Sequence, residues 1–131
     1  MTEQIVVGVA LIDGAGRLLV AQRSAPAALA GRWELPGGKV DPGEDDRAAL
    51  IRECQEELDV TVDLQERVGS DVPIGPHGTL RVWAARIASG QLRAIEHAEL
   101  RWITAEELDA LAWLPADRPL LPALHELLRD P

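Results

Sequence analysis

GKVDPGEDDRAALIRECQEELDV, residues 38–60, is the stretch that decides how this sequence folds. It places Glu53, Glu56 and Glu57 at positions i, i+3 and i+4, which lie on one face of an α-helix. Three neighbouring carboxylates repel one another unless a cation lies among them. Hard divalent ions such as Mg²⁺ and Mn²⁺ prefer oxygen ligands, so the spacing predicts a metal site on a helix.

The same stretch indicates where that helix begins and how it packs. Pro42 and Gly43 precede a run of acids, which stabilise the positive N-terminal end of a helix, so we expect the helix at about Asp45 to Leu58. Its apolar stripe consists of Leu50, Ile51, Cys54 and Leu58. The centre of the three glutamates lies well away from that stripe. The helix is therefore expected to pack by one side and to present its acids on another.

Length and composition indicate the class of protein. The chain has 131 residues, which suits one domain, 1–131, with its own core. Its net charge of −9 and lack of a basic run argue against binding a nucleic-acid polymer. No apolar run approaches the roughly 20 residues that cross a bilayer, and the N-terminus has no basic leader, so we expect a cytoplasmic protein. The single cysteine, Cys54, excludes an internal disulfide and is expected to be a small core residue.

Hydrophobic runs and turn residues predict the other elements. We expect strands at residues 5–12, 17–23, 33–35, 60–72, 79–87 and 100–103, with a bulge near 65–66. Turns are expected at residues 13–16, 36–38, 73–78 and 89–90. A capping box at 104–107 opens a short helix, and residues 117–129 form a C-terminal helix with its leucines buried. The order predicts an α/β domain in which helices cover the faces of a mixed sheet.

Residues 38–60 resemble the Nudix box, G-x5-E-x7-R-E-U-x-E-E-x-G-U, where U is an apolar residue. The matching positions are Gly38, Glu44, Arg52, Glu53, Cys54, Glu56, Glu57 and Val60. Asp59 stands where the family has glycine, and we expect it to adopt a left-handed conformation there at a small cost in stability. The segments 21–23 (AQR), 31–39 (GRWELPGGK) and 114–117 (LPAD) extend the resemblance to the MutT-like branch, small nucleoside triphosphate pyrophosphohydrolases. The resemblance implies the Nudix α/β/α sandwich with a mixed sheet.

The resemblance also implies which residues hold the metal. The ligands would be Glu53, Glu56 and Glu57, together with the backbone carbonyl of Gly37 or Gly38. Two or three Mg²⁺ ions, with Mn²⁺ as a substitute, would neutralise the phosphates and lower the pKa of the attacking water.

Other residues would act around the metal. Arg52 would hold the glutamates through its planar guanidinium, and Glu44 would either brace the loop or hold a water at the metal. The general base would be Glu53, Glu56 or Glu96. Glu96 lies in a loop where MutT-like proteins often bring an extra acid to the metals, although a solvated loop residue is the alternative. We expect His97, the next residue, to be a surface or structural side chain.

A second set of residues would contact the substrate. Lys39 would contact a phosphate and Arg23 would face the substrate, with a surface side chain as the alternative for each. Glu34 is also expected to bind the substrate. Trp33 and Trp83 would either flank a stacked base or fill the core, because the chain has no Phe or Tyr.

The prediction of which base the substrate contains depends on Asp117. MutT itself has an amide at the corresponding position, whereas an ionised aspartate only accepts hydrogen bonds, which favours the amino group of cytosine. The segment 115–117 also looks like that of CTP/dCTP pyrophosphohydrolases, although Asp117 could serve only as a helix cap.

We therefore expect a hydrolase that converts CTP, dCTP or 5-methylated cytidine triphosphates to the monophosphate and pyrophosphate. Oxidised dGTP is the alternative substrate, which would imply nucleotide-pool sanitation. ADP-ribose, a dinucleotide, or a non-catalytic nucleotide-binding module is less favoured. The sequence does not choose between a monomer and a homodimer.

Overall fold

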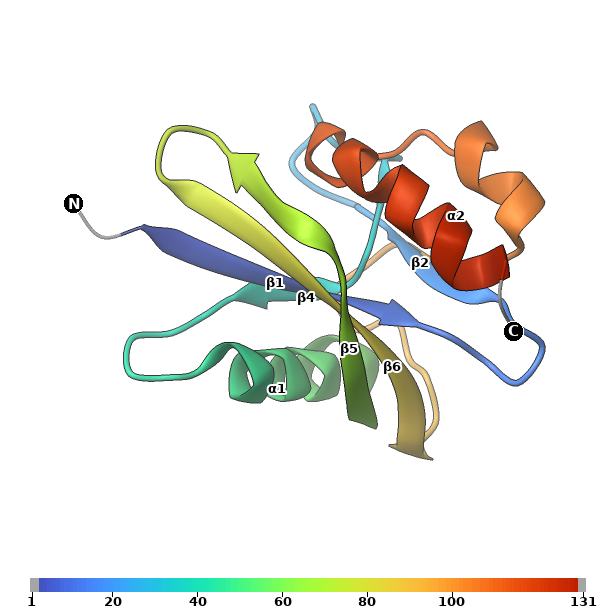
Figure 1. Cartoon of the computed structure of the whole chain (residues 1–131), viewed down its shortest axis with the longest axis horizontal. Helices are drawn as coiled ribbons and strands as arrows, with labels where there is room; N and C mark the ends of the chain where they lie inside the picture. The colour runs from blue at the N-terminus through green and yellow to red at the C-terminus, as the bar shows by residue number, and fades with distance from the viewer. Residues whose placement is uncertain (1–2, 130–131) are drawn as a thin grey trace.

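Two β-sheets form the centre of the protein, whose computed structural model describes residues 3–129 (Figure 1). The larger sheet has four strands in the order β4-β1-β6-β5. These strands are β1 (Gln4–Leu11), β4 (Gly37–Lys39), β5 (Val60–Ile74) and β6 (Gly78–Gly90). Strands β1 and β6 run parallel, whereas β4 and β5 pair antiparallel with their neighbours, so the predicted mixed sheet is confirmed.

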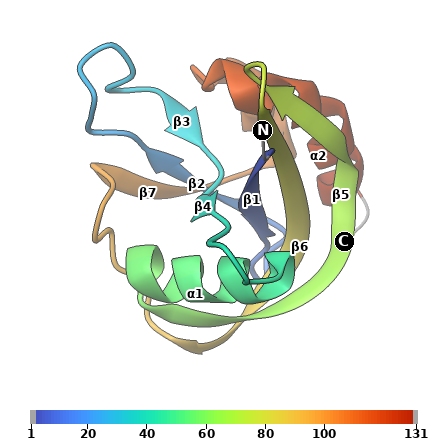
Figure 2. The same ribbon diagram turned by 90° about the vertical axis from the view of Figure 1, so that its left-hand side faces the viewer.

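The smaller sheet is antiparallel and has the order β3-β2-β7. Its strands are β2 (Leu18–Gln22), β3 (Trp33–Glu34) and β7 (Glu99–Ile103). Figure 2 shows this sheet lying beside the larger one, with β4 between them. The expected turn after β1 is present, but β1 and β2 enter different sheets and the two segments pair only at Ile12 and Leu18. The sequence pattern predicted one mixed sheet and did not indicate that the strands divide into two sheets.

Helices lie on both sides of the mixed sheet. Helix α1 (Asp46–Leu58) covers one face, and α2 (Leu121–Arg129) lies on the opposite side (Figure 1). Two short 3₁₀ helices, η1 (Ala105–Ala110) and η2 (Pro115–Leu120), precede α2. No helix among the described residues is long and apolar enough to cross a membrane. The first two and last two residues of the expected domain lie outside the described residues.

Alternation along β1 divides the core into two clusters. One cluster packs the sheet against α1 and includes Val7, Val9, Leu11, Leu50, Cys54 and Leu58. The other packs the opposite face against η2 and α2 and includes Ala10, Val82, Trp113, Leu120 and Leu124. The α/β/α layers expected from the sequence are therefore present.

Both ends of α1 agree with the sequence. The Asp45 side chain caps the helix by accepting a hydrogen bond from the Ala48 N–H at 2.7 Å. At the other end Asp59 has φ 61° and ψ 34°, and its N–H donates to the Gln55 carbonyl. The left-handed conformation predicted for Asp59 is confirmed. The predicted bulge also lies where expected, between Leu64 and Arg67 of β5.

Three local predictions were wrong. Residues 37–38 were expected in a turn, but they pair with β1 as part of β4. Residues 89–90, also expected to turn, pair with the start of β5. The C-terminal helix begins at Leu121 rather than at Asp117, because Pro122 has no N–H to donate to the Arg118 carbonyl, as a helix continuing from Asp117 would require.

Candidate active site

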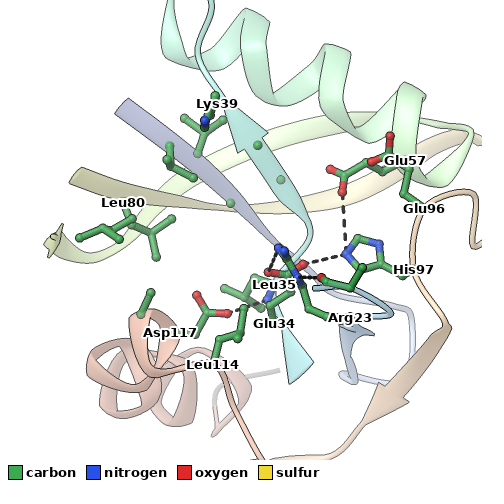
Figure 3. A pocket seen from close by; sticks show the side chains of 18 of the residues that line it. Arg23, Glu34, Leu35, Lys39, Glu57, Leu80, Glu96, His97, Leu114 and Asp117 are labelled. Atoms are coloured by element: carbon green, nitrogen blue, oxygen red, sulfur yellow. Dashed lines mark hydrogen bonds and ion pairs between the residues drawn. The ribbon is translucent and has the colours of Figure 1, made fainter. Parts of the chain in front are cut away.

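A cleft of about 440 Å³ lies beside β1 and β4, and segments from distant parts of the sequence line it. In Figure 3 Leu114 and Asp117 lie at one end of the cleft, Glu57 and Glu96 lie at the other, and Arg23, Glu34 and Leu35 lie between them. We name the two ends by their residues. The Asp117 end consists of Leu114, Ala116 and Asp117, with Leu35 next to them. The acidic end consists of Glu57 and Glu96, which line the cleft, together with Glu53 and Glu56, which lie on the same helix as Glu57 but do not line the cleft.

Two glycines let α1 approach the edge of the sheet. A Cβ atom on Gly38 would overlap Oε2 of Glu53, so this carboxylate lies directly against the backbone. Gly37 has φ 156°, and a Cβ atom there would overlap the carbonyl oxygen of Val7. A side chain at Gly37 would push β4 away from β1, and one at Gly38 would displace the Glu53 carboxylate.

The three glutamates of α1 have different surroundings. The side chain of Glu56 is 51% exposed, that of Glu53 is 15% exposed and that of Glu57 is only 7% exposed. Glu57 lies three residues after the buried Cys54, at the edge of the packed face of the helix. The expectation that all three acids point away from the core is therefore wrong for Glu57.

Arg52 connects the helix to the loop before it. Its Nε and Nη2 donate to the two carboxylate oxygens of Glu44 at 2.8 and 3.0 Å. Its Nη1 lies 3.3 Å from Glu53 Oε1 and 3.1 Å from Glu56 Oε1, and Nη2 also donates to the Lys39 carbonyl at 3.1 Å. Glu44 in turn accepts from the Asp41 N–H, so it braces the loop, the first of the two roles expected for it.

Burial and crowding shift the acids toward their neutral forms. Burial raises the pKa of Glu53 to about 7, and the Glu56 and Glu96 carboxylates add to the shift while Arg52 opposes it. Burial raises the pKa of Glu57 to about 8, with further contributions from Glu53, Glu96 and Glu34. A cation among these groups would favour their ionised forms.

The other end of the cleft depends on Asp117. Its residue surface is only 6% exposed, and Oδ2 accepts a hydrogen bond from the Leu35 N–H at 3.0 Å (Figure 3). Burial raises the pKa of Asp117 to about 7, although the Leu35 N–H lowers it, and Glu34 contributes to the rise. Asp117 lies inside η2 rather than capping a helix.

A family model described as the NUDIX domain matches residues 2–124. The protein belongs to the Nudix family of hydrolases. It is 50% identical over 121 residues to the putative 8-oxo-dGTP diphosphatase 2 of Mycobacterium tuberculosis (strain ATCC 25618 / H37Rv), covering 90% of this chain and 85% of that protein. It is 40% identical to the CTP pyrophosphohydrolase of Escherichia coli (strain K12), covering 95% and 94% of the two chains.

A solved structure gives the same assignment. The solution structure of the E. coli ORF135 protein superposes with a TM-score of 0.82 at 37% identity, covering 97% of this chain and 91% of that one. Together these findings confirm the predicted Nudix fold and establish the chain as a Nudix pyrophosphohydrolase.

Nudix hydrolases generally use a divalent metal ion, and the acidic end offers ligands suited to one. All of its side-chain donors are carboxylate oxygens, which hard divalent ions prefer. Oε2 of Glu57 is buried and has no hydrogen-bond partner among the described residues. Within residues 3–129 no three acidic, histidine or cysteine side chains already converge on one point. Nη1 of Arg52 contacts both Glu53 and Glu56, so an ion would compete with Arg52 for both carboxylates.

Most of the other residues predicted for the Nudix site also line the cleft. Arg23, Glu34, Lys39, Glu96 and Asp117 all do so. Glu96 is exposed, yet its charge reaches both Glu53 and Glu57.

The two tryptophans do not line the cleft. Trp33 and Trp83 are 5% and 7% exposed and pack in the two core clusters, so they fill the core rather than flank a base. Arginines cover their rings: Arg101 lies 4.6 Å from the centre of the Trp33 ring, and Arg67 lies 4.8 Å from that of Trp83.

Sequence reasoning missed two features of the site. The side chain of His97 is only 5% exposed and lies in the cleft wall, where it contacts Glu34 and Glu57. The backbone N–H of Leu35, which holds Asp117, was not expected either. Neither carried a signal in the sequence, because each contact joins segments more than 35 residues apart.

Proposed function

We propose that this enzyme is a Mg²⁺-dependent nucleoside triphosphate pyrophosphohydrolase that releases a nucleoside monophosphate and pyrophosphate. The observation that carries the proposal is the buried Oε2 of Glu57, which has no hydrogen-bond partner within residues 3–129. It lies at one end of a cleft whose other end holds a buried carboxyl, Asp117. One end suits a metal and phosphates, and the other suits the edge of a base.

The ion would be held by Glu53, Glu56 and Glu57, with a carbonyl of Gly37 or Gly38 and with Glu96. When bound, a divalent ion neutralises phosphate charge and makes water a better nucleophile. Mn²⁺ has similar ligand preferences and would substitute for Mg²⁺.

The protein groups around that ion have separate tasks. Arg52 keeps Glu53 and Glu56 beside the Gly37-Gly38 strand, because its contacts join the helix to Glu44 and to the Lys39 carbonyl. Lys39 is exposed at the rim of the cleft, where its ammonium would meet a phosphate. Glu53 and Glu96 are the candidates to accept the proton of the attacking water, and the more exposed Glu56 is the third.

Asp117 supports two candidate bases. When ionised it accepts hydrogen bonds, which suits the amino group of cytosine, and 5-methylcytosine presents the same group. When protonated it also donates, which suits the carbonyl of oxidised guanine. A pKa of about 7 makes both forms available near neutral pH. The names of the two relatives support the same pair of substrates, because one is called a CTP pyrophosphohydrolase and the other a putative 8-oxo-dGTP diphosphatase.

A panel of nucleoside triphosphates compared by kcat/KM tests this assignment. We expect dCTP, CTP, 5-methyl-dCTP and 8-oxo-dGTP to be hydrolysed better than dATP or dTTP. Asp117→Asn keeps an oxygen that can accept from the Leu35 N–H but cannot ionise, so it should lower the preference for cytidine about tenfold relative to 8-oxo-dGTP. An unchanged preference in this variant would show that Asp117 does not contact the base.

A further inference from the structure

His97 is a buried polar side chain in an exposed loop. The residues on either side of it, Glu96 and Ala98, are exposed, but the imidazole is only 5% exposed and lies in the wall of the cleft. Its Nδ1 atom is buried with no hydrogen-bond partner among the described residues. Burial of a polar ring has a cost in free energy, so its other nitrogen must make a contact that offsets it.

That contact is made by Nε2, which faces two carboxylates. It lies 2.8 Å from Oε2 of Glu34 and 3.8 Å from Oε1 of Glu57 (Figure 3). Because an ionised carboxylate only accepts hydrogen bonds, Nε2 carries the hydrogen and donates it to Glu34. This Nε2–H group lies between the carboxylates of Glu34 and Glu57 and is the hydrogen-bond donor that separates them.

Glu34 is also in contact on its other side. Its Oε1 lies 3.6 Å from Nη1 of Arg23, and Nε of Arg23 donates to the Ala25 carbonyl. The side chains therefore form a row, Arg23–Glu34–His97–Glu57, and every member of the row lines the cleft. The row joins the middle of the cleft, between the two sheets, to helix α1.

We propose that His97 is a positioning residue that fixes Glu34 and, through it, the guanidinium of Arg23 for contact with the nucleotide. The proposal rests on the proposed function. Without the Nε2–H group, Glu34 loses its shortest contact, so it turns away and Arg23 loses its ion pair. Because the short contact is to Glu34 and not to Glu57, the effect falls on nucleotide binding more than on turnover.

Replacement of His97 by residues of similar size tests the proposal. His97→Phe fills the same space without a donor, and we expect it to raise KM about tenfold with kcat changed less than about threefold. His97→Gln restores an N–H donor and should recover most of the loss. His125→Phe is the matched control, because His125 also contacts a carboxylate, Asp109 at 3.0 Å, but lies away from the cleft.

A double-mutant cycle separates positioning from packing. In a Glu34→Ala background His97→Phe should change KM less than about twofold, because its partner is already absent. An equal effect of His97→Phe in both backgrounds, or a failure of His97→Gln to recover KM, would overturn the proposal. The urea midpoint of His97→Phe should stay close to that of the wild type, which excludes general loss of structure.

Two readouts need no turnover. Long-range ¹H–¹⁵N spectra of the three histidines should show the His97 hydrogen on Nε2, shifted in Glu34→Ala while the His77 and His125 signals stay in place. Calorimetric binding of α,β-methylene-dCTP should weaken in His97→Phe by the same factor as KM rises. If the wild type binds this analogue but hydrolyses no triphosphate, the proposed function fails while the binding cycle still tests His97. If binding is the same in wild type and His97→Phe, the inference about His97 fails by itself.

Discussion

The two ends of the cleft are built in different ways. The acidic end comes mainly from one continuous stretch, residues 37–57, in which β4, a capped loop and α1 follow one another. The Asp117 end is assembled from η2 and from Leu35, which are joined by a hydrogen bond across 82 residues of sequence. Helical spacing therefore places Glu53, Glu56 and Glu57 near one another, whereas the other end exists only once the two sheets have packed.

Glu57→Gln is expected to have the largest effect, because it removes the most buried carboxylate of the acidic end. We expect kcat/KM to fall on the order of 10²–10³-fold, since a group aimed at the reacting charge is lost. Steady-state rates at saturating Mg²⁺ measure this. Glu56→Gln, at the exposed neighbouring position, should lose less activity, and equal activity of Glu57→Gln and wild type would contradict the metal assignment.

The same variant should have the opposite effect on stability. A carboxyl group whose pKa rises to about 8 on folding destabilises the fold progressively as the pH increases from 4.5 to about 8. Glutamine does not titrate, so in EDTA the free energy of unfolding of Glu57→Gln should exceed that of the wild type by more at pH 8 than at pH 5. Urea unfolding at the two pH values gives the comparison, and a difference that does not depend on pH would show that Glu57 is not repelled in the metal-free protein.

Arg52→Lys tests whether the acidic end depends on a planar guanidinium. Lysine keeps the charge but cannot pair with both oxygens of Glu44, so we expect activity or Mg²⁺ affinity to fall about 10–100-fold. The Mg²⁺ concentration at half-maximal rate is the measurement. Arg47→Lys, at an exposed position of the same helix, is the control and should behave as the wild type.

The sequence predicted the acidic end in more detail than the rest of the molecule. The start of α1 near Asp45 and the left-handed Asp59 were expected from the local sequence, and the resemblance to the Nudix box implied that Arg52 contacts the glutamates, as it does with Glu53 and Glu56. Spacing did not reveal that Glu57 is buried, because that depends on the strands and the loop that pack against its side of the helix. The position of Glu57 required the tertiary structure.

At the Asp117 end the sequence indicated the candidate residue but not its protonation state. Asp117 was taken as ionised, yet burial raises its pKa to about 7, and no local pattern indicates burial of a residue in a proline-rich 3₁₀ segment. Trp33 and Trp83 were equally ambiguous, because a large aromatic side chain suits both a core and a base-binding site. No sequence pattern predicted the contacts of His97, because its partners, Glu34 and Glu57, come from β3 and α1.

The Asp117 end should respond to pH in a way that the acidic end does not. Asp117 is ionised above about pH 7 and protonated below it. The ratio of kcat/KM for dCTP to that for 8-oxo-dGTP should therefore increase between pH 6 and pH 8, by at most about 100-fold if each base uses only one form of Asp117. Because metal binding affects both substrates alike, it cancels from this ratio. Asp117→Asn should show a ratio that does not change with pH.

Asp59→Gly should have the smallest effect. Glycine adopts positive φ without a steric cost, so the free energy of unfolding should increase by about 0.5 kcal/mol. Activity should stay the same, because the Asp59 side chain is exposed at the end of α1 and does not line the cleft. Thermal unfolding and kcat/KM with dCTP measure the two quantities. A loss of activity would show that this position of the box does more than end the helix.

Product analysis during a Mg²⁺ titration tests the central proposal most directly. Wild-type enzyme and Glu57→Gln are incubated with dCTP and, in parallel, with 8-oxo-dGTP, and the products are followed by ³¹P NMR. We predict that the wild type releases pyrophosphate and the nucleoside monophosphate only when Mg²⁺ or Mn²⁺ is present, and that Glu57→Gln releases almost none. Release of orthophosphate and a nucleoside diphosphate, or equal rates with and without metal, would contradict the account.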